Sequence, residues 1–189
     1  MKTKNETALL IDAAYLNLSA KAAGWNMDML KLKRLLEEKA NNKGPIREGH
    51  YLNSVAPEHL TDSVHRFHTY LKSAEPTGPQ LRVELYGHKK MSHTCPGCKH
   101  TSYRRIQQGV DVAIAMRIIM LSEKYDQLIL LAGDADFLDA VRYMKAKGTK
   151  RLVIAGFRGS VSADLQSYAD EVIWLDDYAA IIRREAKAA

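Results

Sequence analysis

Short apolar runs that alternate with amphipathic helical patterns are the feature that most limits how this chain can fold. The runs at residues 8–11 and 128–132 are aliphatic throughout, which is typical of strands covered on both faces. Between them, residues 28–40 place three leucines on one face of a helix. Strands covered on both faces require helices on either side. We therefore expect an α/β fold, a three-layer α/β/α sandwich with a mostly parallel central sheet.

The rest of the chain continues this alternation. Residues 87–110 are the exception, because they contain no acidic residue and many basic ones, which indicates an inserted basic loop at residues 88–108. At 189 residues the chain is long enough for one domain and short for two, so we expect a single domain over residues 1–189. Further strands are predicted at residues 50–55, 81–86, 151–155 and 171–175, and further helices after Pro57 and at residues 111–123 and 135–147.

Composition limits the class of protein and its partners. With 46% hydrophobic and 26% charged residues, the chain matches a globular protein and excludes a disordered chain or a disulfide scaffold. Basic residues outnumber acidic ones by 28 to 22, which favours a polyanionic partner such as nucleic acid. No apolar run approaches the roughly 18 residues of a membrane helix, so we expect no membrane contact. The two cysteines and the absence of a secretory signal pattern predict the cytoplasm.

Four aspartates are placed where the predicted strands and helices would bring them together. Asp12 follows the first apolar run, and Asp134 and Asp136 follow the run at 128–132. Asp111 begins the helix that leads into that strand. Ligand sites in parallel sheets lie beyond the carboxyl ends of the strands, so these carboxylates are expected to converge. Their mutual repulsion requires a divalent cation, and oxygen ligands suit Mg²⁺ or Mn²⁺.

A metal held by carboxylates can activate a water molecule and stabilise charge on a phosphodiester, without a covalent nucleophile. The same four residues also have a purely structural interpretation. Asp12 would then end a strand, Asp111 and Asp134 would cap helices, and Asp136 would be a solvated residue of a first helical turn. Spacing alone leaves both interpretations open.

Several ordered motifs resemble one family. These are Leu-Ile-Asp at residues 10–12, Gly-Val-Asp-Val-Ala-Ile-Ala at 109–115, Ala-Gly-Asp-Ala-Asp-Phe at 132–137 and Ser-Ala-Asp-Leu at 162–165. Together they resemble the NYN domain of the PIN-like nuclease superfamily, in its LabA-like branch, over residues 8–175. The resemblance implies a Rossmann-like nuclease fold that acts on RNA. It also implies that Asp12, Asp111, Asp134 and Asp136 bind the metal and that Ser162 lies in a loop that closes the site.

Two positions depart from the family pattern. Family members commonly carry Asn three residues after the first Asp, where this chain has Tyr15, and Asn17 stands two positions later as a substitute amide. Many also have Asp six residues after the Val-Asp-Val aspartate, where this chain has Arg117. These departures bear on a second metal position and on substrate alignment. They motivate an alternative function, a nucleic-acid-binding or regulatory module with the same fold and little or no catalysis.

The two cysteines form a separate motif in the basic loop. His93, Cys95, Cys98 and His100 offer two thiolates and two imidazoles within eight residues, which suits tetrahedral zinc, and the intervening Pro-Gly allows a tight turn. Two other interpretations stay open, an unmetallated loop and a redox-active thiol pair.

The function predicted from these observations is a Mg²⁺- or Mn²⁺-dependent endoribonuclease that cleaves single-stranded RNA. Basic side chains on the acid-free stretches 87–110 and 140–163 would guide the strand. A phosphatase of the haloacid-dehalogenase type is a third function, but its motif needs an acid where Ala14 stands. The sequence does not indicate whether the protein is a monomer or an oligomer. The predicted substrate-binding residues are Asn17, Arg104, Arg105, Arg158 and Ser162.

Overall fold

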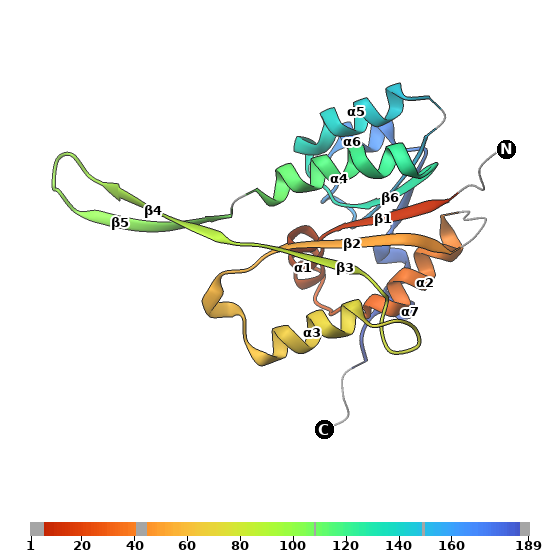
Figure 1. The fold of residues 1–189 in the computed structure, drawn as a ribbon, viewed down its shortest axis with the longest axis horizontal. Helices are drawn as coiled ribbons and strands as arrows, with labels where there is room; N and C mark the ends of the chain where they lie inside the picture. The colour runs from red at the N-terminus through yellow and green to blue at the C-terminus, as the bar shows by residue number, and fades with distance from the viewer. Residues whose placement is uncertain (1–5, 41–44, 108, 149, 186–189) are drawn as a thin grey trace.

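The centre of the molecule is a six-stranded sheet in which all neighbouring strands run parallel (Figure 1). The computed structural model describes residues 6–40, 45–107, 109–148 and 150–185. The strands lie in the order β3-β2-β1-β6-β7-β8. Their bounds are Thr7–Asp12 for β1, Ile46–Ser54 for β2, Arg82–Tyr86 for β3, Gln127–Leu131 for β6, Arg151–Gly156 for β7 and Glu171–Trp174 for β8.

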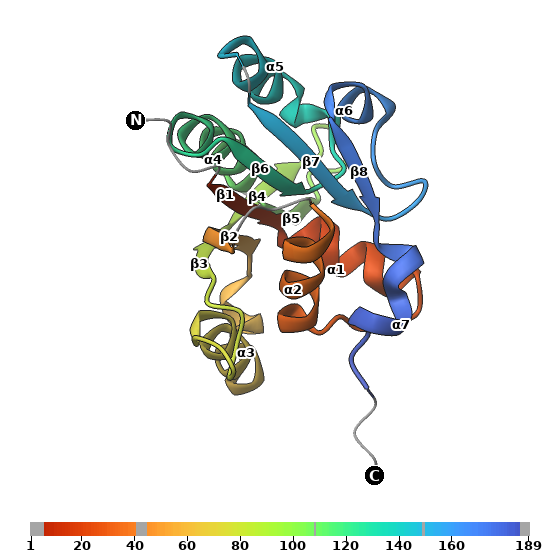
Figure 2. The same ribbon diagram turned by 90° about the vertical axis from the view of Figure 1, so that its right-hand side faces the viewer.

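Helices cover both faces of this sheet, as Figure 2 shows. One face carries α1 (Ala13–Ala22), α2 (Met29–Lys39), α3 (Asp62–Lys72) and α7 (Ala179–Ile182). The other face carries α4 (Val110–Lys124), α5 (Leu138–Ala146) and α6 (Ala163–Tyr168). Single-turn 3₁₀ helices, η1 (Pro57–His59), η2 (Ala135–Phe137) and η3 (Leu175–Tyr178), join these elements. In the described part of the chain, no helix is both long and apolar enough to cross a membrane.

The two faces of the sheet bury two separate apolar clusters, and successive residues of one strand contribute to different clusters. In β1, Leu9 and Ile11 pack under α1 and α2, whereas Ala8 and Leu10 pack under α4. Every residue of β1 and β6 is buried. The predicted α/β sandwich with a mostly parallel sheet is therefore confirmed, because its premise of strands covered on both faces holds.

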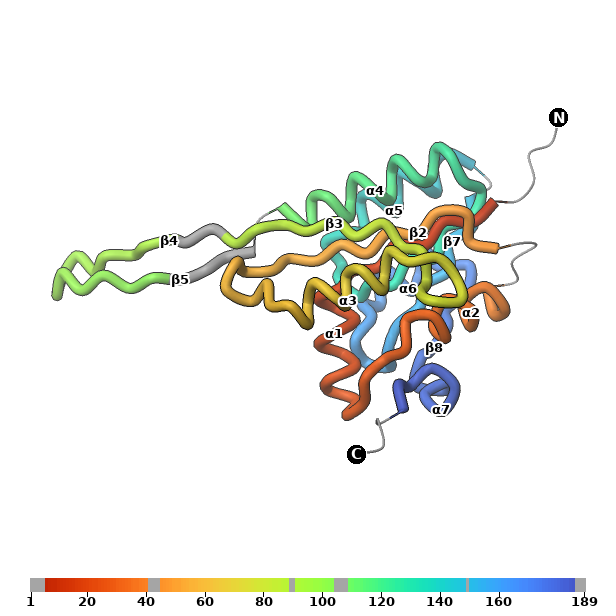
Figure 3. The backbone as a smooth tube through the Cα atoms, turned by 60° about the horizontal axis from the view of Figure 1, so that its bottom comes forward, coloured from red at the N-terminus to blue at the C-terminus, as the bar shows by residue number. Residues whose placement is uncertain are grey.

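The predicted basic loop is wrong in one respect, because its residues form a regular two-stranded hairpin. Strand β4 (His88–Thr94) pairs antiparallel with β5 (Thr101–Gln107) over seven residue pairs. Figures 1 and 3 show this hairpin projecting from the body of the protein on the side where β3 ends. The segment has few apolar residues that could order it by burial. Antiparallel ladders satisfy the backbone without a core, however, and Thr94 and Thr101 add a hydroxyl pair at 2.9 Å.

Candidate metal and nucleic-acid site

Two of the predicted acids follow neighbouring strands of the sheet. Asp12 is the last residue of β1 and the N-cap of α1, where its Oδ1 accepts the Tyr15 N–H at 3.1 Å. Asp134 follows β6, the direct neighbour of β1, and its Oδ1 accepts the Asp136 N–H at 3.0 Å. Each aspartate is thus positioned by a strand end and held by a capping hydrogen bond. Asp12 is only 8% exposed.

Asp111 reaches the same edge of the sheet from a helix. It occupies the first turn of α4, and the preceding Gly109 has the left-handed backbone angle φ = 78° that lets the chain turn from the hairpin into the helix. Helix α4 packs on β1 and β2, on the face toward which Asp12 points.

The four carboxylates act on one another electrostatically. Burial raises the pKa of Asp12, the charges of Asp111 and Asp134 raise it further, and the backbone N–H groups of Tyr15 and Ala14 act in the opposite direction. Burial also raises the pKa of Asp111, together with the charges of Asp134 and Asp136. Within the described residues, none of the four carboxylates forms an ion pair with a basic side chain. The site therefore holds negative charge that the protein itself does not neutralise.

These residues fit a hard divalent cation by their chemistry, since all four offer carboxylate oxygens and none of them is paired with a basic side chain in the described part of the chain. The four residues match a cation in charge, but their side chains do not form a coordination shell in this structure. Among the described residues, no three His, Cys, Asp or Glu side chains lie close enough together to hold a metal ion. The four aspartates nevertheless lie near enough at one edge of the sheet for their charges to affect one another's pKa values.

Sequence reasoning did not identify Tyr51, which lies on β2 next to this edge. Tyr51 pairs with Ile11 of β1, and its buried hydroxyl accepts a hydrogen bond of 3.4 Å from the exposed Asn17 amide. Burial raises the Tyr51 pKa, the Asn17 hydrogen bond lowers it and the Asp12 charge raises it again. Tyr51 therefore links Asn17, which it contacts, to Asp12, whose charge acts on it.

Tyr15, at the position where the family commonly has Asn, serves a different purpose here. Its hydroxyl accepts the Phe157 N–H at 3.0 Å and shares a hydrogen bond of 2.7 Å with Ser160. Its ring also lies so close to Gly133 that a Cβ there would approach it to 2.5 Å. Tyr15 therefore ties α1 to the loops that follow β6 and β7.

Ser162, predicted to lie in a loop that closes the site, follows β7 and precedes α6. Its Oγ caps α6 by accepting the Leu165 N–H at 3.2 Å, and its N–H donates to the Gly133 carbonyl at 2.9 Å. Ser162 therefore fixes the loop next to Asp134, and the contacts that the structure gives it are those of a capping residue.

The acid-free stretch at 140–163 is largely neutralised by acids from elsewhere in the chain. Arg158 pairs with Asp177 at 2.6 Å, and its guanidinium lies 5.5 Å from the centre of the Trp174 ring. Counting charges along the sequence could not identify these partners. The side chains of Arg104 and Arg105 lie outside what the structure describes. Arg142 likewise pairs with Asp139, Lys145 with Asp170, Lys150 with Asp126 and Arg151 with Glu171.

A second charged cluster, unpredicted by sequence reasoning, lies under α4 on β2 and β3. The buried His50 contacts Glu84 at 2.7 Å and Glu48 at 2.9 Å through its two ring nitrogens. Arg117 pairs with Glu84 through two hydrogen bonds of 2.8 and 2.9 Å. Glu48 is further bound by Arg82, Lys124 and the Tyr125 hydroxyl. The available signal was polar residues two apart in a strand, which place Glu48 and His50 on one face.

This cluster is balanced, in contrast to the aspartates. Burial alone would raise the Glu48 pKa, but the hydrogen bonds from Lys124, Tyr125 and His50 and the charge of Arg82 lower it to about 2. Arg117, the second departure from the family pattern, belongs to this cluster.

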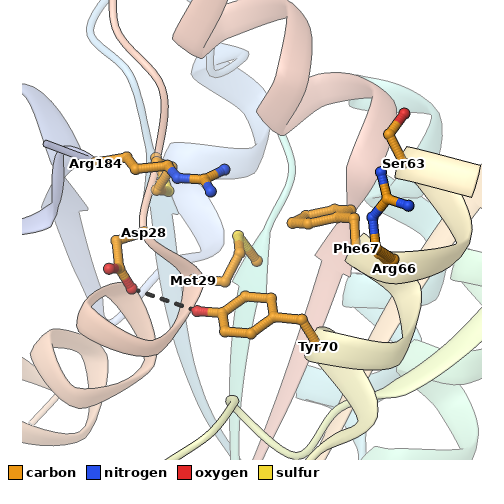
Figure 4. A pocket seen from close by; sticks show the side chains of 8 residues that line it. Asp28, Met29, Ser63, Arg66, Phe67, Tyr70 and Arg184 are labelled. Atoms are coloured by element: carbon orange, nitrogen blue, oxygen red, sulfur yellow. Dashed lines mark hydrogen bonds between the residues drawn. The ribbon is translucent and has the colours of Figure 1, made fainter. Parts of the chain in front are cut away.

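Two cavities differ in their relation to the aspartates. A groove of about 540 Å³ between α4 and α5 is lined by Asp111, Asp136, Asp139 and Arg142 together with apolar side chains. A separate cavity of about 490 Å³ lies between α2, α3 and the C-terminal arm, where Tyr70 donates to Asp28 at 3.5 Å (Figure 4). No predicted site residue lines this second cavity.

Sheet order, helical layers and the acidic edge together define a PIN-like nuclease fold. The sequence profile of the NYN domain matches residues 6–176, and the chain belongs to this family. It is 28% identical over 76 residues to the low amplitude and bright protein LabA of Synechococcus elongatus, an alignment that covers 40% of each chain. The chain thus spans less than half the length of that relative.

One solved structure is similar over nearly the whole fold. It is a protein of unknown function from Vibrio parahaemolyticus, with a TM-score of 0.67 at 20% identity, covering 96% of this chain and 98% of the other. This similarity supports the fold alone.

Proposed function

We propose that this protein is an endoribonuclease that uses Mg²⁺ or Mn²⁺ bound at the acidic edge of the sheet. The observation that carries the proposal is the set of four carboxylates, Asp12, Asp111, Asp134 and Asp136, without a neutralising cation. Asp12 is buried and the other three are exposed, and gathering their charges around a buried carboxylate costs stability unless a cation compensates it. Membership of the NYN family agrees with a nuclease.

In this proposal the four aspartates hold the metal and fix its position through their strand-end and helix-cap geometry. The bound cation would supply an activated water molecule and charge stabilisation at the scissile phosphodiester. The exposed Asn17 amide, which the buried Tyr51 hydroxyl holds beside Asp12, would hydrogen-bond the substrate. The groove next to Asp111 and Asp136 gives the strand a path to the carboxylates. Ser162 would hold the loop that borders this path.

The proposed substrate is single-stranded RNA, and the proposed compartment is the cytoplasm. The hairpin joins α4 just before Asp111, and its sequence carries Arg104 and Arg105 without any acid. Basic side chains on such an arm would track phosphates. Arg158 would bind phosphate only after release from Asp177, so we expect it to contribute less to RNA binding than Arg104 and Arg105. Both cysteines are free thiols, which agrees with a reducing compartment.

Cleavage of a labelled single-stranded RNA with Mn²⁺ tests the proposal. Asp134→Asn should fold normally and lose about 10²- to 10³-fold in rate, the usual loss when one charge-stabilising group is removed. Asp126→Asn is the matched control, since Asp126 precedes β6 at the opposite edge of the sheet, where it pairs with Lys150. Full activity of a folded Asp134→Asn protein would refute the assignment.

A specific observation also supports the alternative of a binding or regulatory module with little catalysis. Arg117 stands where many family members have an acid, and it is committed to Glu84. RNA binding without cleavage in Mn²⁺, by protein that still gains thermal stability from the metal, would favour this alternative.

We also propose a structural zinc ion at the hairpin tip, with Cys95 and Cys98 as ligands. Thiolates prefer zinc over Mg²⁺ or Mn²⁺, so this site and the aspartate site would select different metals. His93 and His100 are the imidazole ligands predicted from the sequence.

A further inference from the structure

The Cys-Pro-Gly-Cys turn closes the hairpin at the point farthest from the sheet (Figures 1 and 3). The Cys95 N–H donates to the His100 carbonyl at 2.9 Å, and the Lys99 N–H donates to the Cys95 carbonyl at 2.9 Å. Lys99 adopts the left-handed angle φ = 60°. These bonds fold the turn back on itself and place both cysteines on it.

The turn is arranged around the Cys95 sulfur. A Cβ added to Gly97 would lie 4.0 Å from this sulfur, so the sulfur lies over the turn that ends at Cys98. The thiolate is the form of cysteine that binds metal. The turn therefore presents two free cysteines, three residues apart in the chain.

Two thiolates are half of a tetrahedral zinc site. His93 pairs across the hairpin with Ser102, one residue pair further from the tip than Thr94 and Thr101. His100 follows the turn. Neither joins the thiols in a group of three or more ligands that could hold a metal, in the part of the chain that the structure describes. The projecting arm also keeps the tip away from the helices and the sheet. The tip by itself therefore offers two of the four ligands, and a second copy of the chain can offer the other two.

We propose that two copies of this chain meet at their hairpin tips and share one zinc ion, each supplying Cys95 and Cys98. This inference rests on the zinc part of the proposed function. Two identical halves related by a two-fold axis complete a closed Cys₄ site without any new side chain. Residues 96–100 are exposed, so the tip can approach a second tip without unfolding.

Charge favours zinc as the joining ion. The segment from 87 to 110 has no acid, and it includes Lys99 at the turn. Two such tips repel each other. A zinc ion with four thiolates carries a net charge of −2, which offsets this repulsion. The resulting dimer would hold two aspartate sites apart, joined by two basic arms.

The test uses untagged, reduced, full-length protein, its zinc content and its mass in solution. The proposal expects a dimer with one zinc per two chains, and conversion to a monomer by a zinc chelator. Cys95→Ser combined with Cys98→Ser should be a zinc-free monomer, whereas His93→Ala combined with His100→Ala should keep both the zinc and the dimer. Cobalt substitution should give the absorption of a four-sulfur tetrahedral site.

Three results would overturn the proposal. One zinc per monomeric chain, lost in the histidine double variant, would assign the site to a single chain. A dimer that survives removal of zinc would mean that another surface joins the copies. Absence of zinc from reduced protein would refute the zinc site itself. RNA cleavage and its dependence on Mn²⁺ are measured separately, so failure at the tip is distinguishable from failure at the aspartates.

Discussion

The molecule contains two clusters of carboxylates under the same helix, and they are treated in opposite ways. At the carboxyl edge of the sheet, Asp12 and Asp111 have raised pKa values and no basic partner among the described residues. On β2 and β3, Glu48 is surrounded by four donors, and its pKa falls to about 2. Both clusters involve α4, which carries Asp111 and Arg117.

The difference separates charge kept for a ligand from charge used to hold the fold. A buried carboxylate with basic partners is part of the structure, whereas one left uncompensated costs stability and is retained only where something else binds it. The number of acidic residues along the sequence therefore does not distinguish the two clusters. The positions of the basic side chains in the fold distinguish them.

The largest effect is expected from His50, which links the two glutamates of the balanced cluster. His50→Ala removes two hydrogen bonds to carboxylates at a buried position, and each hydrogen bond to a charged group typically contributes about 1.5–3 kcal/mol, so the loss should reach about 3 kcal/mol or more. Urea denaturation would measure this loss.

His68→Ala is the matched control for this change. His68 is also buried, at 5% exposed, but it has no carboxylate partner in the described part of the chain. Its removal should cost about 1–2 kcal/mol, in the ordinary range for a point substitution. Equal losses at the two histidines would show that packing, and not charge, explains the effect at His50.

Opposite pH dependences should distinguish the two clusters in metal-free buffer. Glu48 has a pKa of about 2 in the folded state against 4.5 ordinarily, so it contributes stability above pH 4.5 that is lost as the pH falls toward 2. Asp12 has a raised pKa, so its contribution is present below pH 3.8 and is lost as the pH rises through the folded-state value.

Two variants isolate these contributions across pH 2–7. Glu48→Gln should lose stability increasingly as the pH rises, by up to about 3 kcal/mol. Asp12→Asn should gain stability as the pH rises, on the order of 1 kcal/mol, because Asn keeps the N-cap without the charge. Added Mg²⁺ should raise the melting temperature of wild type and not of Asp12→Asn. Asp28→Asn, the equivalent cap of α2, should leave the metal response of wild type unchanged.

The sequence was sufficient for the parallel sheet and for the meeting of Asp12 and Asp134, because aliphatic runs and strand ends are local patterns with one geometric outcome. It was insufficient for Arg117, since a departure from a motif does not say which acid the new side chain will pair with. It also missed the hairpin at 88–107, whose order comes from backbone pairing. Arg158 shows the same limit, because its partner Asp177 is distant from the aspartate motifs.

The smallest effect is expected at Arg117, where the two clusters come nearest to each other on one helix. Arg117→Met removes the pair with Glu84, which is partly exposed, so the loss of stability should be about 1 kcal/mol. Arg117 pairs with Glu84, and in the part of the chain that the structure describes it contacts none of the four aspartates, so RNA cleavage with Mn²⁺ should remain at the wild-type rate. A clear rise in cleavage would instead mean that Arg117 restrains the site. That outcome would break the separation of the clusters and favour a regulatory module.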